Sequence, residues 1–234
     1  MPGRKPVSAV VLTVALSIIL GTTCQAIAQD TKTPYPNMAS LDQYLMPDRD
    51  SEIALARTAA PESISRDAKI LVLGPHGYET AVEGKNGFVC IVQRSWTAPP
   101  DDPDFWNPKL RAPICYNAAA ARSYLLRPIK KTELILAGRT KAQMVDAIVA
   151  AIDKKELPPM EPGSMCYMLS KQGFINASAG HWHPHLMFFF SDADPASWGS
   201  DLSGSPVLAA NDKWEHVTTF MVLVRNWSDG TPDH

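Results

Sequence analysis

The chain has 234 residues, of which 45% are hydrophobic, 8% aromatic and 20% charged, a composition typical of folded globular proteins. Its 22 Lys and Arg against 24 Asp and Glu leave a net charge of −2. This near balance lacks the basic surface on which nucleic-acid binding depends, so we expect no DNA or RNA partner. Twenty prolines disfavour long helices, because proline breaks helix interiors.

The first 28 residues have the pattern of a secretory signal peptide. Arg4 and Lys5 precede an apolar run over residues 7–20, and residues 26–28 read Ala-Ile-Ala, an Ala-x-Ala cleavage site. The run is shorter than the roughly 20 residues that cross a bilayer, which argues against an uncleaved anchor. We expect cleavage after Ala28, a periplasmic or secreted protein, and no membrane span in the mature chain.

Residues 29–47 are rich in Pro, Asn, Ser and Thr and predict an irregular lead-in to a single domain over residues 48–234. Within that domain, apolar residues at helical spacing predict a short helix over residues 50–60 that Pro61 ends. A β-rich run follows at residues 69–73.

Residues 78–83 and 88–96 are strand-like and flank Gly84-Lys85-Asn86-Gly87. Asn-Gly between such runs favours a tight hairpin, because both residues tolerate a positive φ. The sequence therefore predicts that these two runs pair with each other.

Three cysteines remain after the predicted cleavage, and they lie in a compartment that permits disulfides. Cys90 and Cys115 bracket a proline-rich loop over residues 97–113, and a bond between them would restrain it. Pairing of Cys115 with Cys166 is the alternative, and the odd count leaves one thiol unpaired.

Two helices are predicted in the middle of the chain. Asn117 is placed to cap the first, over residues 118–127, which Pro128 should end, and Thr140 with Gln143 forms a capping box for a second helix over residues 141–155.

Strand candidates follow at residues 165–170, 186–190 and 217–225. Segregated helices and strands predict an α+β fold, with an antiparallel sheet of about five strands and helices packed on one face. This element order resembles the layout of PAS-like and profilin-like ligand-sensing modules.

Three of six histidines, His181, His183 and His185, stand within five residues, a density that prompts a metal hypothesis. On an extended chain they face one way, but a straight strand brings only two of them to one ion. His216 is the expected additional ligand, and the metal would be zinc or copper, with nearby Met side chains favouring copper.

A metal-free pocket for a small organic ligand, with Trp182 and His76 in contact with it, is the second interpretation of the same cluster. The third is structural, with the histidines bonded only to backbone groups at a turn.

Signature motifs of hydrolases, zinc proteases and nucleotide enzymes are absent, among them Gly-x-Ser-x-Gly, His-Glu-x-x-His and the P-loop. The catalytic candidates are Glu215 or Glu79 as a general base and Cys166 as a nucleophile.

The leading prediction is an exported binding or sensing module whose His-rich site takes a transition metal or a small ligand. A metal-dependent hydrolase with a three-His site and a structural envelope interaction protein are the alternatives. The sequence does not indicate a protein partner for such an envelope interaction protein.

Overall fold

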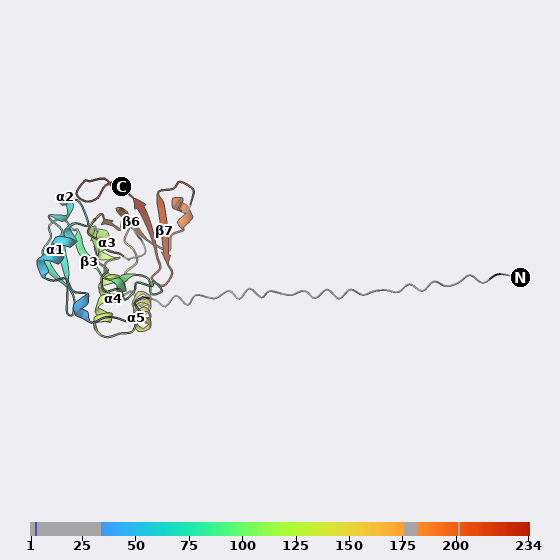
Figure 1. The fold of residues 1–234 in the computed structure, drawn as a ribbon, viewed down its shortest axis with the longest axis horizontal. Coiled ribbons are helices and arrows are strands. Elements are labelled where there is room, and N and C mark those ends of the chain that lie inside the picture. Colours follow the sequence, from blue (N-terminus) through green and yellow to red (C-terminus); the bar gives the residue numbers. More distant parts are fainter. Residues whose placement is uncertain (1–2, 4–33, 176–181, 201) are drawn as a thin grey trace. The chain divides into compact units, whose positions relative to one another are not determined.

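The computed structural model describes residues 3, 34–175, 182–200 and 202–234, so the predicted signal peptide lies outside the described residues. Thr33–His234 forms one compact unit. It is built on an eight-stranded mixed sheet in the order β2-β1-β3-β4-β5-β6-β8-β7 (Figure 1). The α+β class is confirmed, but the prediction of about five antiparallel strands is wrong, because there are eight strands and β1 runs parallel to β3.

The strands are β1 (Lys69–Gly74), β2 (Gly77–Val82), β3 (Val89–Gln93), β4 (Ala112–Tyr116), β5 (Met165–Met168), β6 (His185–Ser191), β7 (Val207–Asp212) and β8 (Val217–Leu223). The α-helices are α1 (Arg49–Arg57), α2 (Glu62–Ser65), α3 (Ala118–Arg122), α4 (Leu126–Leu136) and α5 (Lys141–Asp153). Short 3-10 helices are η1 (Leu41–Gln43), η2 (Ser95–Thr97) and η3 (Pro195–Trp198).

The predicted hairpin between residues 78–83 and 88–96 is wrong. β2 pairs instead with β1 through a tight turn at Pro75-His76, and β1 separates β2 from β3. Since β1 is apolar on both faces and β2 is partly exposed, β1 belongs inside the sheet and β2 at its edge. Gly84 lies in the crossover, where a Cβ would come within 2.2 Å of the Lys69 backbone nitrogen.

Two strands escaped the sequence prediction. β4 carries Pro113 in a central position, opposite Val92 of β3, where proline is rarely found. β7 reads Val-Leu-Ala-Ala-Asn-Asp and lies at the other edge of the sheet, where it pairs with β8 alone. Its alanines and polar end have low strand propensity.

α4 was also missed, because Pro128 was taken as the end of a helix. The chain makes the short helix α3 with Asn117 as its cap, and then starts α4 at Leu126. Pro128 therefore stands in the first turn of α4, where a missing backbone N–H costs no helical hydrogen bond. The capping box of α5 is confirmed, with both reciprocal hydrogen bonds present.

Helices cover both faces of the sheet, so the prediction of helices on one face is wrong as well. α1 packs on the face that presents Ile70, Val72, Cys90 and Cys115. The opposite face, with Ile91, Ile114 and Tyr116, packs against α3 and the residues that lead into α4. With this layering and eight strands, the resemblance to PAS-like and profilin-like layouts is not supported.

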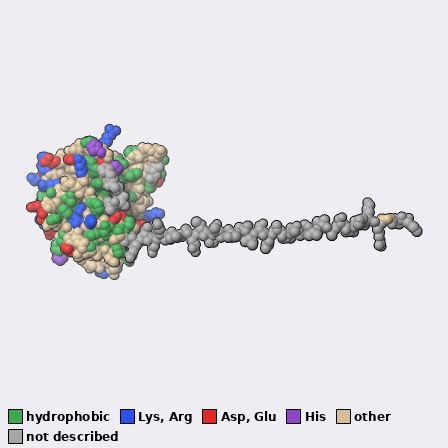
Figure 2. Space-filling view, in the orientation of Figure 1, with side chains coloured by type: hydrophobic (Ala, Val, Ile, Leu, Met, Phe, Trp, Pro, Cys, Tyr) green, Lys and Arg blue, Asp and Glu red, His purple; other side chains and the backbone are tan. Residues whose placement is uncertain are grey.

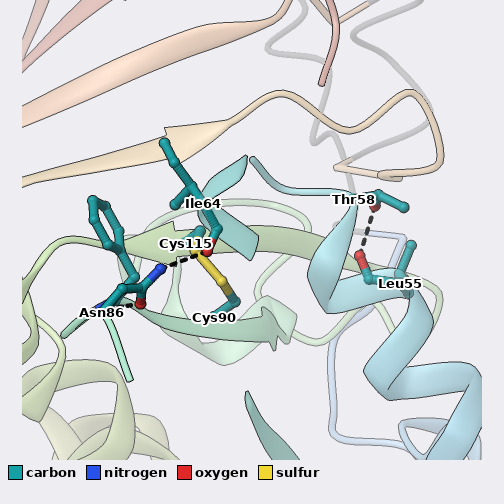
Figure 3. The surroundings of a disulfide bond; sticks show 7 residues. Leu55, Thr58, Ile64, Asn86, Cys90 and Cys115 are labelled. Carbon is teal, nitrogen blue, oxygen red and sulfur yellow. Dashed lines mark hydrogen bonds between the residues drawn. A yellow bond between two sulfur atoms is a disulfide. The ribbon is translucent and has the colours of Figure 1, made fainter. Parts of the chain in front are cut away.

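The disulfide joins Cys90 to Cys115, directly opposite each other on β3 and β4. Figure 3 shows this bond between the neighbouring strands, close to Asn86, whose side chain donates to the Ile64 carbonyl. The bond therefore fastens two central strands and closes the loop between them. Cys166 is the free, buried cysteine.

No helix among the described residues is long and apolar enough to cross a membrane. On the face seen in Figure 2, acidic and basic side chains are interspersed and form no patch of one sign.

Candidate functional site

A cavity of about 460 Å³ lies on the sheet face opposite α1, within the roughly 300–1,000 Å³ of small-molecule sites. Its boundaries are β5, β6 and β8, the loop over residues 97–101, Lys131 of α4, and the β7–β8 turn. None of the described histidines lines it.

One wall of the cavity is apolar, because alternate residues of each strand face the same side of the sheet. Met187 of β6 stands directly opposite Met221 of β8, and Met168 of β5 adds a third thioether. Val217 and Ile175 extend the same surface. We call these five residues the apolar wall, which suits a hydrophobic body of variable shape because Met is flexible and polarisable.

At the other end of the cavity the lining includes Lys131 and Glu215, and Arg127 lies behind them, next to Glu215. We call these three almost fully buried side chains the charged end. Lys131 Nζ contacts Glu215 Oε1, and Arg127 Nε lies 3.6 Å from Glu215 Oε2. Arg127 and Lys131 are spaced i, i+4 on α4, so they share one face of the helix. Burial lowers the pKa of Arg127, and the Glu215 carboxylate opposes this effect.

The turn between β7 and β8 places Glu215 in the charged end. Asp212 Oδ1 accepts the backbone N–H groups of Trp214 and Glu215, at 2.9 and 3.0 Å, and His216 takes a positive φ of 52°. Trp214 lines the cavity mouth while 63% of its surface is exposed. A turn at the sheet edge thus supplies the only acidic group that contacts the two cations among the described residues.

Tyr124 also lines the cavity. Its ring stacks on Phe189 with centroids 3.8 Å apart. Burial raises the pKa of Tyr124 well above its ordinary value, and the nearby Glu215 carboxylate adds to this. The hydroxyl therefore stays protonated and is available as a neutral donor to a bound molecule.

The histidine cluster is only partly described, because His181 lies outside the described residues. His185 is buried, and its Nδ1 lies 2.8 Å from the His183 carbonyl oxygen, so this nitrogen carries the proton. His183 is exposed, and its Nδ1 lies 2.5 Å from Asp233 Oδ2. Burial lowers the pKa of His185, which favours the neutral ring.

His216 is not brought to this cluster. It follows the β7–β8 turn next to Asp192, its Nδ1 lying 3.2 Å from Asp192 Oδ2. His185 and Ser191 are at opposite ends of β6, roughly 20 Å apart at the usual strand rise. A single ion therefore cannot bind both His185 and His216.

The remaining candidates fall into different places. Glu215 reaches the cavity, whereas Glu79 is exposed on β2 and pairs with Arg49, and His76 lies exposed in the β1–β2 turn. Trp182 packs edge-to-face on His185 and donates to the Ser170 carbonyl. Cys166 is buried, and burial raises its pKa, so its thiol is held in the protonated form.

Sequence reasoning missed Arg127, Lys131 and Tyr124. Positions 124, 127 and 131 follow the i, i+3, i+7 spacing of one helix face. That spacing would have been visible had Pro128 been placed in the first turn of a helix.

Among the described residues, no group of three or more His, Cys, Asp or Glu side chains is arranged to hold a metal ion. Comparisons with protein-family models, with curated proteins and with solved structures found no match for this chain.

Proposed function

We propose that this chain is a binding module for a small, mainly apolar molecule that carries one polar group. The observation that carries the proposal is a cavity that has an apolar wall and includes the buried pair Lys131–Glu215 in its lining. The apolar wall would hold the body of the ligand by removing it from water. The charged end and the Tyr124 hydroxyl would fix its orientation, since a few well-placed polar groups give such sites their specificity.

The proposal also includes export. The signal-like residues 4–28 and the Cys90–Cys115 disulfide both support an oxidising compartment. Expression of the full chain in a bacterial host, with N-terminal sequencing of the protein recovered from the periplasm, tests this part. A mature N-terminus at Gln29 is expected, and a full-length cytoplasmic product would contradict it.

Binding is tested by isothermal titration with three probes that share one tail: decanoate, decanol and decylamine. We expect at least one of them to bind. Ala210→Trp should weaken that binding at least about tenfold, because Ala210 lines the cavity.

Ala209→Trp is the matched control, since neighbouring residues of a strand face opposite sides of the sheet. This variant should bind as the wild type does. Failure of all three probes, or unchanged binding by Ala210→Trp, would overturn the proposed function.

A further inference from the structure

We infer that the ligand of this cavity is an organic anion whose carboxylate binds at the charged end, against Lys131 of α4. The inference rests on the proposed binding function and deepens it by naming the class of ligand. It comes from the imbalance of donors and acceptors around Arg127, Lys131 and Glu215.

Two buried cations share one carboxylate at this end. Arg127 is 2% exposed and Lys131 6%. Arg127 Nη1 donates to the Ser123 and Pro158 carbonyl oxygens, but its buried Nε has no hydrogen-bond partner. At 3.6 Å, Glu215 Oε2 is too far to accept from Nε. An unpaired buried N–H of this kind is costly. A small shift of Glu215 toward Arg127, when a ligand carboxylate takes its place on Lys131, would satisfy it.

Lys131 also has donor capacity left. Its ammonium contacts Glu215 Oε1, and its second acceptor is the Thr97 carbonyl oxygen at 3.5 Å. An ammonium has three donors, so one remains for a ligand. Asp212, the other acid at this end, uses Oδ1 to accept two backbone N–H groups and so fixes the turn.

The two cations and the Glu215 carboxylate come from different structural elements. Arg127 and Lys131 stand on one face of α4, with backbone carbonyls around them, whereas Glu215 comes from a turn at the sheet edge. The Glu215 carboxylate therefore occupies the place of an anionic ligand group. A ligand carboxylate can share Lys131 with it or displace it from Lys131, whereas an ammonium ligand would meet the like charge of Lys131.

The three probes named above separate head-group preference from cavity binding. The wild type should bind decanoate at least about tenfold more tightly than decanol, as expected of charge-assisted hydrogen bonds. Decylamine should bind most weakly. Equal or tighter binding of decanol or decylamine would overturn the anion inference and leave the proposed function standing, whereas failure of all three probes would overturn both.

Substitutions at Lys131 and Glu215 test whether these two residues set the preference for an anionic head group. Glu215→Gln keeps the shape but removes the competing negative charge, so decanoate should bind more tightly and decanol unchanged. Lys131→Met should abolish the difference between decanoate and decanol. Lys213→Met removes the same charge from the exposed cavity mouth and should keep the difference.

Should Lys131→Met fail to fold, the double variant Lys131→Met/Glu215→Gln replaces it, because it leaves no buried carboxylate without a partner lysine. This variant should also bind decanoate no better than decanol. A preserved preference for decanoate in either variant would overturn the role assigned to Lys131.

Discussion

At the scale of single residues, the described part of the chain buries the ion pairs Arg94–Glu52 and Lys131–Glu215 in different surroundings. Arg94 and Glu52 are linked at 2.9 Å, and each also bonds backbone groups: Arg94 Nε donates to the Tyr44 carbonyl, and Glu52 Oε1 accepts from the Leu73 N–H. Most hydrogen-bond donors and acceptors of this pair therefore have partners, and the pair links α1 to the sheet. Arg94 and the Lys131–Glu215 pair both line the cavity, but only the Lys131–Glu215 pair lies next to the unsatisfied Nε of Arg127, as we expect of the proposed ligand site.

Lys131→Met should lower the free energy of unfolding by about 3–5 kcal/mol, because it leaves Glu215 buried without its closest partner. Urea denaturation followed by circular dichroism measures the change. The neighbouring Lys130→Met is the control, since Lys130 is exposed and pairs with Glu133 at 3.8 Å, and its loss should cost under about 1 kcal/mol. Equal effects of the two substitutions would contradict the burial argument.

His185 makes stability depend on pH. Burial lowers its pKa in the folded state, so below the ordinary value near 6.5 the unfolded chain takes up the proton more readily. The contribution of a neutral His185 is therefore fully present above about pH 6.5 and is lost as pH falls through the folded pKa.

Urea midpoints of the wild type and His185→Gln between pH 5 and 8 test this expectation. The difference between the two proteins should shrink as pH falls. A difference that stays constant over the range would show that His185 does not titrate differently in the two states.

At the scale of elements, the Cys90–Cys115 bond joins residues that are 25 positions apart. By the loop-entropy argument, its removal in Cys90→Ala/Cys115→Ala should lower the free energy of unfolding by about 3–4 kcal/mol. Denaturation with and without reductant checks the same quantity in the wild type. Cys166→Ala is the control for loss of a buried thiol, and reductant should have the same effect on this variant as on the wild type.

Elements that depend on local contacts could be predicted from the sequence, whereas elements that depend on contacts between distant residues could not. Asn117 and the Thr140–Gln143 box were correctly placed because a helix cap is a local hydrogen bond. The partner strand of β2 was predicted wrongly. Asn86-Gly87 resembles a hairpin turn, but it lies in the crossover connection that passes next to Lys69. Pro113 and Pro128 led to wrong predictions for the same reason. Whether a strand or helix tolerates a proline depends on the position of the proline within it, which the sequence spacing alone does not reveal.

The candidate site was predicted only in one member, Glu215. The histidines drew attention because of their density, yet the structure separates His216 from His185, and no histidine that the structure describes lines the cavity. The spacing of Arg127 and Lys131 indicates a shared helix face but not that this face is buried. Their importance comes from burial beside a turn more than eighty positions later in the chain, which only the tertiary fold brings together.

At the scale of the whole molecule, the sheet has a firmly packed half and an exposed edge. β1, β3 and β4 are covered on both faces, and the disulfide joins β3 to β4, whereas β7 pairs only with β8, and Leu208 on it is 46% exposed. Local opening should therefore start at β7 and at the β7–β8 turn that carries Glu215. The element that supplies the competing carboxylate is thus also the element that is easiest to move.

Hydrogen–deuterium exchange by mass spectrometry tests this arrangement. We expect peptides over residues 207–216 to exchange fastest among the strands and those over β3 and β4 slowest. Saturating decanoate should slow exchange around Glu215 and Val217 and leave β2, the other edge strand, unchanged, since β2 does not line the cavity. Equal protection of both edges on addition of decanoate would indicate general stabilisation of the fold and would argue against a binding site at the β7–β8 turn.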